Sequence, residues 1–286
     1  MTKQLYLVNP PNPDNMRGFP GALLALDLWM RKNVPEVSST IIDEEETPVA
    51  SLEGSLEKKL QGASGDLYFG ITATTATYQD ALATASALKS LRPNAKVILG
   101  GHHSDGQEDI ILQNSDIDYV VTGEGEKPLE SILRGNLSAL GIHYKGKLSV
   151  IGQSDQGEKL QKNDLNGLTI DQYDPEMQER SMQFDEVNLI TARGCPMQCS
   201  FCSVSNERVR AQDPDVVLNQ IGYLVEKMSE KGEFKPIAIQ DNFFAQNPER
   251  AKEIAHRLVE YKKRTDHELK WNMQTRVEQF KDKELV

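Results

Sequence analysis

The chain has 286 residues, 38% of them hydrophobic and 26% charged, as expected of a folded globular protein of about two domains. Its formal net charge of −11 argues against a general nucleic-acid binder, which would show a basic surface. Because no apolar run approaches the ~18 residues of a membrane span and the stretch MTKQLYLVNPP lacks the apolar core of a signal peptide, we expect a cytoplasmic protein without a membrane span.

Strands alternate with helices over the first part of the chain. Apolar runs rich in Val, Ile and Leu predict strands at residues 4–11, 38–46, 66–75, 95–103 and 118–126. Helical spacing of apolar residues predicts helices at residues 20–33, 50–63, 78–93 and 127–135. Core candidates in the first helix are Leu23, Leu24, Leu26, Leu28 and Trp29. The alternation predicts an α/β fold with a doubly wound parallel sheet, in a first domain over residues 1–140.

The carboxyl ends of these strands carry small, polar or glycine-rich sequences. Ligands of doubly wound sheets bind at that edge, so the sequence predicts a cavity there. The sequences are NPPNP at residues 9–13, ITATTAT at 71–77, GGHH at 100–103 and GEGE at 123–126. The acidic run at residues 43–46 reads as a solvated charge cluster.

The pattern weakens over residues 141–182, which we expect to be a linker with a short hairpin at 142–152. A second domain then covers residues 183–286. It opens with a strand that runs into a cysteine-containing loop, and it continues with three βα units. The expected helices are at residues 213–232 and 247–266, and Asp213 or Asp215 is expected to cap the first of them. Further strands are expected at residues 235–244 and 268–277, and another helix is expected to start at residue 280.

All the cysteines of the chain lie in one short stretch, RGCPMQCSFC. Cys195, Cys199 and Cys202 have the spacing C-x3-C-x2-C, and an odd, tightly spaced set makes a poor disulfide framework. Thiolates are soft ligands for iron–sulfur clusters, zinc and copper(I). A structural zinc site would need a fourth ligand, and the nearest histidines, His143 and His256, are distant in sequence. A non-catalytic iron–sulfur or zinc protein is therefore the rival to an enzyme.

This spacing at the end of a strand, with an aromatic residue before the third cysteine, resembles the radical S-adenosylmethionine (SAM) enzymes. The resemblance implies that Cys195, Cys199 and Cys202 hold a [4Fe-4S] cluster, whose open iron binds SAM. Reductive cleavage of SAM would then give a 5′-deoxyadenosyl radical. It also implies a partial (β/α) barrel, which here stops after about three βα units, and we expect the natural chain to continue past Val286.

The resemblance extends to candidate SAM contacts. The turn IQDNFF stands where many members of that family contact the SAM amino group, so Asp241 with Gln240 or Asn242 is a candidate, and a helix N-cap is the alternative for Asp241. An arginine after the third strand could pair with the SAM carboxylate, and a surface salt bridge is the alternative. The candidate SAM-binding residues are Phe201, Gln240, Asp241, Asn242, Gln274 and Arg276.

The order of the two domains resembles the cobalamin-binding radical SAM family, also called class B radical SAM methylases. Its cobalamin-binding-like Rossmann domain places a loop at each of the strand ends quoted above. The candidate cobalamin-binding residues are Pro10, Pro11, Thr72, Thr74, Thr75, Gly100, Gly101, His102, Gly123, Glu124 and Gly125. Ordinary tight turns, a packed histidine and a helix N-terminus are the alternatives at these positions. The Asp-x-His-x-x-Gly loop of other cobalamin domains is absent: the loop after the second strand reads DEEETPVA.

The resemblance implies a cobalamin-dependent radical SAM enzyme, with methyl transfer to an unactivated carbon or phosphorus centre as the expected reaction. Ring closure and skeletal rearrangement stay open, as does a radical SAM enzyme whose first domain binds no cobalamin. The partners expected are a small-molecule substrate and an electron donor such as flavodoxin or ferredoxin, with no nucleic acid.

Overall fold

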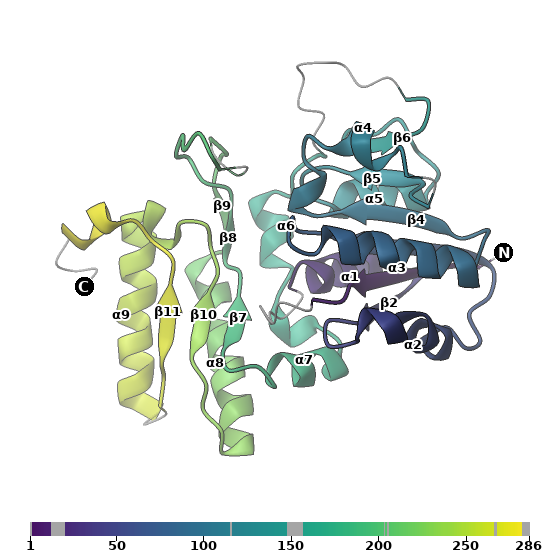
Figure 1. The fold of residues 1–286 in the computed structure, drawn as a ribbon. Coiled ribbons are helices and arrows are strands. Elements are labelled where there is room, and N and C mark those ends of the chain that lie inside the picture. Colours follow the sequence, from purple (N-terminus) through teal and green to yellow (C-terminus); the bar gives the residue numbers. More distant parts are fainter. Residues whose placement is uncertain are drawn as a thin grey trace. The chain divides into compact units, whose positions relative to one another are not determined.

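The structure is a computed structural model that describes residues 2–12, 21–114, 116–147, 157–202, 204, 206–265 and 268–281. The chain forms two compact units, Met1–Leu160 and Gln161–Val286 (Figure 1). The expected hairpin at 142–152, the expected helix from 280 and the end of the first strand loop at residue 13 lie partly outside the described residues.

The first unit is built on a six-stranded sheet in the order β2-β1-β3-β4-β5-β6. The first five strands pair in parallel, and β6 joins the edge antiparallel to β5. The strands are β1 (Lys3–Asn9), β2 (Ser38–Asp43), β3 (Asp66–Thr72), β4 (Lys96–Gly100), β5 (Tyr119–Val121) and β6 (Ile142–Tyr144). This confirms the predicted doubly wound parallel sheet, with the start of the expected hairpin serving as its last strand.

Helices cover both faces of this sheet, which explains why its strands are apolar on both sides. Consecutive residues Val97, Ile98 and Leu99 of β4 are all buried. In Figure 1, α2 and α3 lie on one face, and α1 and α5 on the other. The helices are α1 (Gly21–Asn33), α2 (Leu52–Lys59), α3 (Tyr78–Leu91), α4 (Glu108–Ile111) and α5 (Glu126–Leu133), with short 3-10 turns η1 (Val49–Ser51) and η2 (His102–Ser104). Of the core candidates in α1, Leu26 alone is not fully buried.

The acidic run at residues 43–46 is not a solvated cluster, and that prediction was wrong. Glu44 is 0% exposed and Glu45 6% exposed. The Glu44 carboxylate accepts hydrogen bonds from the Ser55 hydroxyl at 3.0 and 2.9 Å and pairs with the Lys59 ammonium at 2.9 Å. The charge is thus buried because α2 presents a hydroxyl and a cation to the end of β2.

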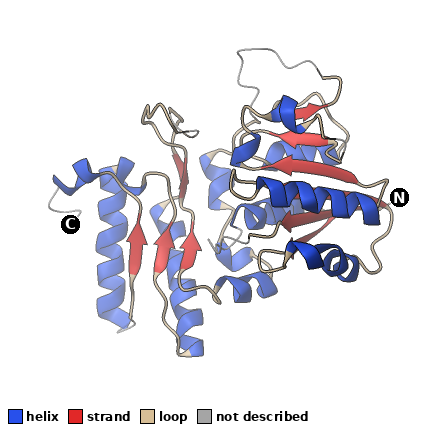
Figure 2. Ribbon diagram, viewed as in Figure 1, coloured by secondary structure: helices blue, strands red, loops and turns tan. Residues whose placement is uncertain are grey.

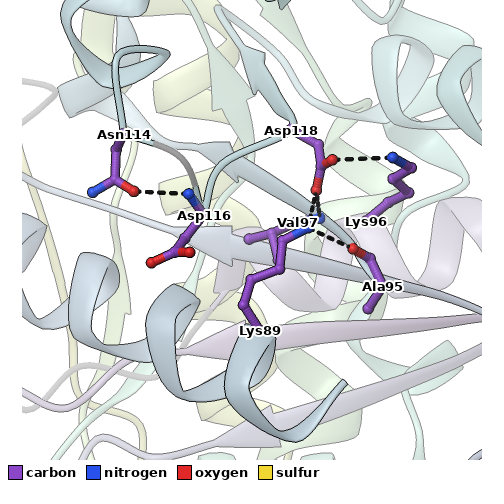
Figure 3. Close-up of polar contacts among 7 residues, drawn as sticks. All are labelled: Lys89, Ala95, Lys96, Val97, Asn114, Asp116 and Asp118. Carbon is purple, nitrogen blue, oxygen red and sulfur yellow. Dashed lines mark hydrogen bonds and ion pairs between the residues drawn. The ribbon is translucent and has the colours of Figure 1, made fainter. Parts of the chain in front are cut away.

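A second carboxylate, whose side chain is 20% exposed, fixes the opposite, amino-terminal edge of the sheet (Figure 3). Asp118, just before β5, accepts hydrogen bonds from the ammonium groups of Lys89 and Lys96 at 2.7 and 3.1 Å and from the Val97 N–H at 2.9 Å. Burial alone would raise the pKa of Asp118, but these hydrogen bonds and the charge of Lys89 lower it below its usual range. The network ties α3, β4 and β5 together.

The second unit contains a parallel sheet in the order β11-β10-β7, with two long helices packed on it (Figure 2). Its elements form two βα units and a third strand: β7 (Val187–Leu189), α8 (Pro214–Lys231), β10 (Ile237–Ile239), α9 (Pro248–Thr265) and β11 (Trp271–Met273). The 3-10 turns η4 (Phe244–Gln246) and η5 (Val277–Lys281) follow β10 and β11. Asp213, one of the two predicted capping residues, stands at the N-cap position of α8, but its carboxylate accepts no hydrogen bond from the helix and binds Asn166 and Lys162 instead.

The two faces of this sheet differ in chemistry. Val187, Leu189, Ile237 and Ile239 are buried in one cluster with the apolar sides of α8 and α9. Alternate residues point to the opposite face, as the period of a strand requires. Apart from buried Ala238 at the centre of β10, those residues are polar and not fully buried: Glu186, Asn188, Gln240, Asn272 and Gln274.

The expected linker is divided between the two units at residues 160 and 161. Its later part is not an irregular linker but holds short helices: α6 (Lys162–Asn166), η3 (Ile170–Gln172) and α7 (Pro175–Ser181). Asp174 caps α7 by accepting a hydrogen bond from the Glu176 N–H at 2.9 Å. No helix among the described residues is long and apolar enough to cross a membrane.

Candidate functional site

The cysteine loop is the connection of a β-hairpin at the carboxyl end of β7. Its arms are β8 (Ala192–Arg193) and β9 (Arg210–Ala211), which pair antiparallel. The backbone turns at Gly194 with φ of 87°, and a Cβ there would lie 2.5 Å from the Arg208 carbonyl oxygen. The Glu207 N–H donates to the Cys195 carbonyl at 2.7 Å across the loop. Glycine is therefore required where the chain enters the cysteine motif.

The three thiols are free, and all three are partly exposed. The Cys202 N–H donates to the Cys199 carbonyl at 3.1 Å, which turns the backbone between these two residues. Within the described part of the chain, no three His, Cys, Asp or Glu side chains converge on one metal ion. A [4Fe-4S] cluster, however, takes each thiolate on a different iron, so three unpaired thiols on one short loop fit a cluster better than a single ion. Phe201 is 91% exposed beside them.

Asp241, which follows β10, is turned into the protein. It is 1% exposed, and both carboxylate oxygens accept hydrogen bonds: Oδ1 from the N–H groups of Thr191 and Ala192 at 2.6 and 2.8 Å, and Oδ2 from the Thr191 hydroxyl at 2.6 Å. Burial raises the pKa of Asp241, whereas these hydrogen bonds and the charge of Arg250 act to lower it. The capping position before α9 belongs instead to Asn247, whose side chain accepts from the Arg250 N–H at 3.3 Å.

The remaining SAM candidates lie at the carboxyl ends of β10 and β11. The Gln274 amide donates to Gln240 at 3.1 Å, and the Gln240 amide donates to Asn188 at 3.0 Å, so one hydrogen-bonded row crosses the polar face of the sheet. Asn242 is exposed. Arg276 pairs with Glu278 at 2.8 Å, and this contact, with smaller effects of Cys199 and Cys195, raises the pKa of Arg276.

An open groove of about 870 Å³ runs behind the second arm of the hairpin. Its lining includes Gln212, Arg250 and His256, and none of the cysteines or the SAM candidates. The Lys162 ammonium in this lining pairs with Asp213 at 2.5 Å, and the Arg257 guanidinium pairs with Asp215 at 2.7 Å. Because these lining cations are already paired with carboxylates, we assign no ligand to this groove.

In the first unit, the strand order reverses between β1 and β3, which is where doubly wound sheets form their ligand crevice. Pro10 and Pro11 follow β1 and are buried. Thr72 ends β3, and Thr74 and Thr75 are exposed beyond it. The predicted residues of these two loops are thus at one edge of the sheet.

Gly101 lets the loop after β4 approach the loop after β3. Its φ is 96°, and a Cβ there would lie 2.5 Å from the carbonyl oxygen and 2.8 Å from the nitrogen of Ala73. The Ala73 N–H donates to the Gly100 carbonyl at 2.8 Å, and the His103 N–H donates to the Ala73 carbonyl at 3.2 Å. Gly100 is not constrained in this way, because a Cβ there meets nothing nearer than Val121 at 3.8 Å.

The histidine that the structure places in contact with the threonine loop is His103, which sequence reasoning did not single out. Its Nδ1 lies 3.3 Å from the Thr75 hydroxyl, and its ring centroid is 4.0 Å from that of Tyr78. His102 is exposed beside it. The sequence alone does not distinguish His102 from His103 as the residue that contacts the threonine loop. The conformation of the 3-10 turn η2 determines that it is His103.

The loop after β5 is held by partners from distant parts of the unit. The Gly123 N–H donates to the Asp105 carboxylate at 2.8 Å, and the Glu124 carboxylate accepts from the Leu160 N–H at 2.9 Å. Buried Thr122 lies 3.0 Å from His143 Nε2. A Cβ on Gly125 would lie 3.2 Å from Leu26. Neither Asp105 nor His143 belongs to a recognisable motif, so their contacts could not be predicted.

Comparison with known proteins finds similarity in both parts of the chain. Residues 40–133 match the family model of the B12 binding domain. A relative from Pyrococcus horikoshii, named as an uncharacterized methyltransferase, is 28% identical over 228 residues, which cover 75% of this chain and 47% of the relative. The anaerobic magnesium-protoporphyrin IX monomethyl ester cyclase of Cereibacter sphaeroides is 25% identical over 244 residues, 81% of this chain and 39% of the cyclase. The chain thus spans half or less of the length of these relatives.

Solved structures resemble nearly the whole chain. The cobalamin-dependent SAM radical enzyme OxsB, solved with aqua-cobalamin and SAM, matches with a TM-score of 0.72 and 18% identity over 94% of this chain and 38% of OxsB. The radical SAM methyltransferase TsrM from Kitasatospora setae matches with a TM-score of 0.68 and 16% identity over 92% of this chain and 52% of TsrM. The chain therefore combines a B12-binding domain match with the fold of cobalamin-dependent radical SAM enzymes, the family that its motifs resemble.

Proposed function

We propose that this chain carries the cofactor-binding part of a cobalamin-dependent radical SAM enzyme that transfers a methyl group to an unactivated centre of a small molecule. When bound, a [4Fe-4S] cluster with SAM would supply a 5′-deoxyadenosyl radical, and cobalamin would supply the methyl group. The observation that carries the proposal is the loop of three free, partly exposed thiols at the carboxyl end of the first strand of a parallel βα unit.

Cys195, Cys199 and Cys202 would hold the cluster. The β8–β9 pair closes the loop that bears them, so the chain enters and leaves the cluster site from a fixed base. Arg276 could move from Glu278 to the SAM carboxylate, since a guanidinium binds either carboxylate in the same bidentate manner. Gln240, Asn242 and Gln274 offer neutral donors and acceptors at the same edge, and exposed Phe201 an apolar surface.

The first unit would bind cobalamin across the crevice between β1 and β3. Rigid Pro10 and Pro11 follow β1, and Thr72, Thr74 and Thr75 at the end of β3 would offer hydroxyl groups to the ligand. Because Gly101 packs closely against Ala73, the loops after β3 and β4 lie against each other, and a flat ligand could lie over them. The loop after β2 contains no histidine, so it offers cobalt no imidazole ligand.

The first test is a visible absorption spectrum and metal analysis of anaerobically purified protein, reconstituted with iron and sulfide, incubated with hydroxocobalamin and desalted. We expect about four irons and about one cobalt per chain. The variant Cys199→Ala should lose the iron and keep the cobalt. Iron without cobalt would contradict the cobalamin assignment and leave a radical SAM enzyme with a different first domain; loss of both would contradict the whole proposal.

Ring closure is the second candidate, because one relative is named as a cyclase. The two reactions differ in the fate of the SAM methyl group. With SAM labelled in its methyl group, a methyltransferase places the label in the product, and a cyclase does not. An electron donor such as flavodoxin or ferredoxin is required for either reaction.

A further inference from the structure

We propose that Asp241 and Arg250 are positioning residues that lock the base of the cysteine hairpin, and thereby fix where Cys195 stands relative to the sheet. The inference rests on the proposed function, because the cysteines matter here as cluster ligands. It assigns Asp241 a role different from a direct SAM contact.

The first part of the lock joins β10 to the entry of the hairpin. Strand β7 ends at Leu189 and β8 begins at Ala192, so the N–H groups of Thr191 and Ala192 fall at the junction of the two strands. The Asp241 carboxylate accepts both, at 2.6 and 2.8 Å, and also the Thr191 hydroxyl at 2.6 Å. With the residue 1% exposed, water cannot replace these bonds.

The second part of the lock ties the two arms of the hairpin to each other. The Arg250 guanidinium, from α9, donates to the Thr191 carbonyl at 3.3 Å and to the Thr191 hydroxyl at 3.1 Å. It also donates to the carbonyl of Gln212 at 3.0 Å, just after β9. The Gln212 N–H in turn donates to the Thr191 carbonyl at 2.9 Å. Thr191 is thus held by a carboxylate on one side and a guanidinium on the other.

A buried carboxylate beside a half-buried guanidinium is a costly way to stabilise a domain, since apolar side chains of similar volume often do so equally well. Burial raises the pKa of Asp241 and lowers that of Arg250, which shows the desolvation that both groups bear. Asp241 and Arg250 instead fix the orientation of the backbone at Thr191 and Ala192, a few residues before Cys195. Outer partners that orient metal ligands typically change metal affinity by about 10–100-fold when removed.

The experiment compares four variants with wild type after cluster reconstitution. Asp241→Ala removes all three acceptor contacts, whereas Asp241→Asn keeps the one oxygen that serves both N–H groups. Arg250→Lys keeps the charge but cannot bridge both arms. Leu258→Ala, on the buried side of α9 and 2% exposed, is the control for stability loss alone. The readouts are the rate of iron loss to a chelator, the reduction potential of the cluster, and amide hydrogen exchange over residues 191–199.

We expect Asp241→Ala to lose iron about tenfold faster than wild type and to shift the reduction potential. Arg250→Lys should lose iron at a rate between those of wild type and Asp241→Ala. Asp241→Asn should stay close to wild type in all three readouts. Leu258→Ala should match wild type in all three readouts despite its lower stability. Equal iron loss and equal exchange in Asp241→Ala and Leu258→Ala would overturn the inference. If wild type binds no iron, the proposed function fails, and the exchange of residues 191–199 alone decides whether the lock exists.

Discussion

At the scale of single residues, Gly101 offers a direct test of how closely the loops after β3 and β4 must approach. Gly101→Ala should lower the free energy of unfolding of the first unit by about 2 kcal/mol or more, since its φ is 96° and its Cβ would lie 2.5 Å from the Ala73 oxygen. It should also reduce cobalamin retention. The neighbouring Gly100→Ala should change stability by less than about 1 kcal/mol. Urea unfolding of both variants measures the two changes in free energy. Equal destabilisation by Gly101→Ala and Gly100→Ala would contradict the structure at this turn.

Asp118 gives a second residue-scale prediction, on the pH dependence of stability. Its pKa is lowered in the folded protein, so its contribution is complete above the ordinary carboxyl pKa of about 4 and is lost as the pH falls through the folded-state value. Asp118→Asn should cost about 1–3 kcal/mol at pH 7, and this difference from wild type should shrink below about pH 4. Asp116→Asn removes the same charge outside the network and should show no such change. A constant difference at all pH values would be inconsistent with the lowered pKa.

The burial of individual charged residues could not be predicted from the sequence. Glu44 and Asp241 are charged residues that follow strands, and each suggested a position open to solvent or ligand. Both are buried because partners from elsewhere in the fold satisfy them: the Ser55 hydroxyl and the Lys59 ammonium for Glu44, and the Thr191 hydroxyl with the N–H groups of Thr191 and Ala192 for Asp241. Partners so distant in sequence leave no local pattern, so burial of this kind could not be read from spacing.

At the scale of elements, the cysteine hairpin depends on its entry turn. Gly194→Ala would place a Cβ 2.5 Å from the Arg208 carbonyl oxygen, and we expect it to open the loop and lower iron incorporation after reconstitution. Gly232→Ala is a matched control in the same unit, since its φ of 68° carries a similar backbone cost while nothing lies within 4 Å of its Cβ. The measurement is the iron content of the Gly194→Ala and Gly232→Ala variants after reconstitution. Equal iron content would show that the turn does not position the cysteines.

The elements themselves were predictable to different degrees. The five parallel strands and the long helices α3, α8 and α9 followed from apolar runs and helical spacing. The arm β8 lies at the end of the strand predicted to run into the cysteine loop, but the break before it and the second arm β9 were not predicted, because two residues show no alternation. The helices α6 and α7 lie in a polar stretch, where packing and the cap at Asp174 decide the structure. The strand ends therefore located the candidate sites, and the tertiary contacts that hold them were seen only in the structure.

At the scale of the whole molecule, the two compact units each have their own buried core, and each holds one of the two tryptophans of the chain. Trp29 is buried in α1 and donates to Glu130 at 3.0 Å, whereas Trp271 in β11 packs edge-on against Phe244. Trp271→Phe leaves a reporter for the first unit, and Trp29→Phe leaves one for the second. Unfolding of the two units can therefore be followed separately.

A ligand that binds only folded protein stabilises the unit that holds its site, by about 2.7 kcal/mol at a hundred times its dissociation constant. Saturating hydroxocobalamin should therefore raise the urea midpoint reported by Trp29 and leave the midpoint reported by Trp271 unchanged. Cluster reconstitution should do the reverse, because the cysteines lie in the second unit. If either cofactor raised both midpoints equally, the units would unfold as one cooperative body. If cobalamin raised only the midpoint of Trp271, its site would not be the crevice between β1 and β3.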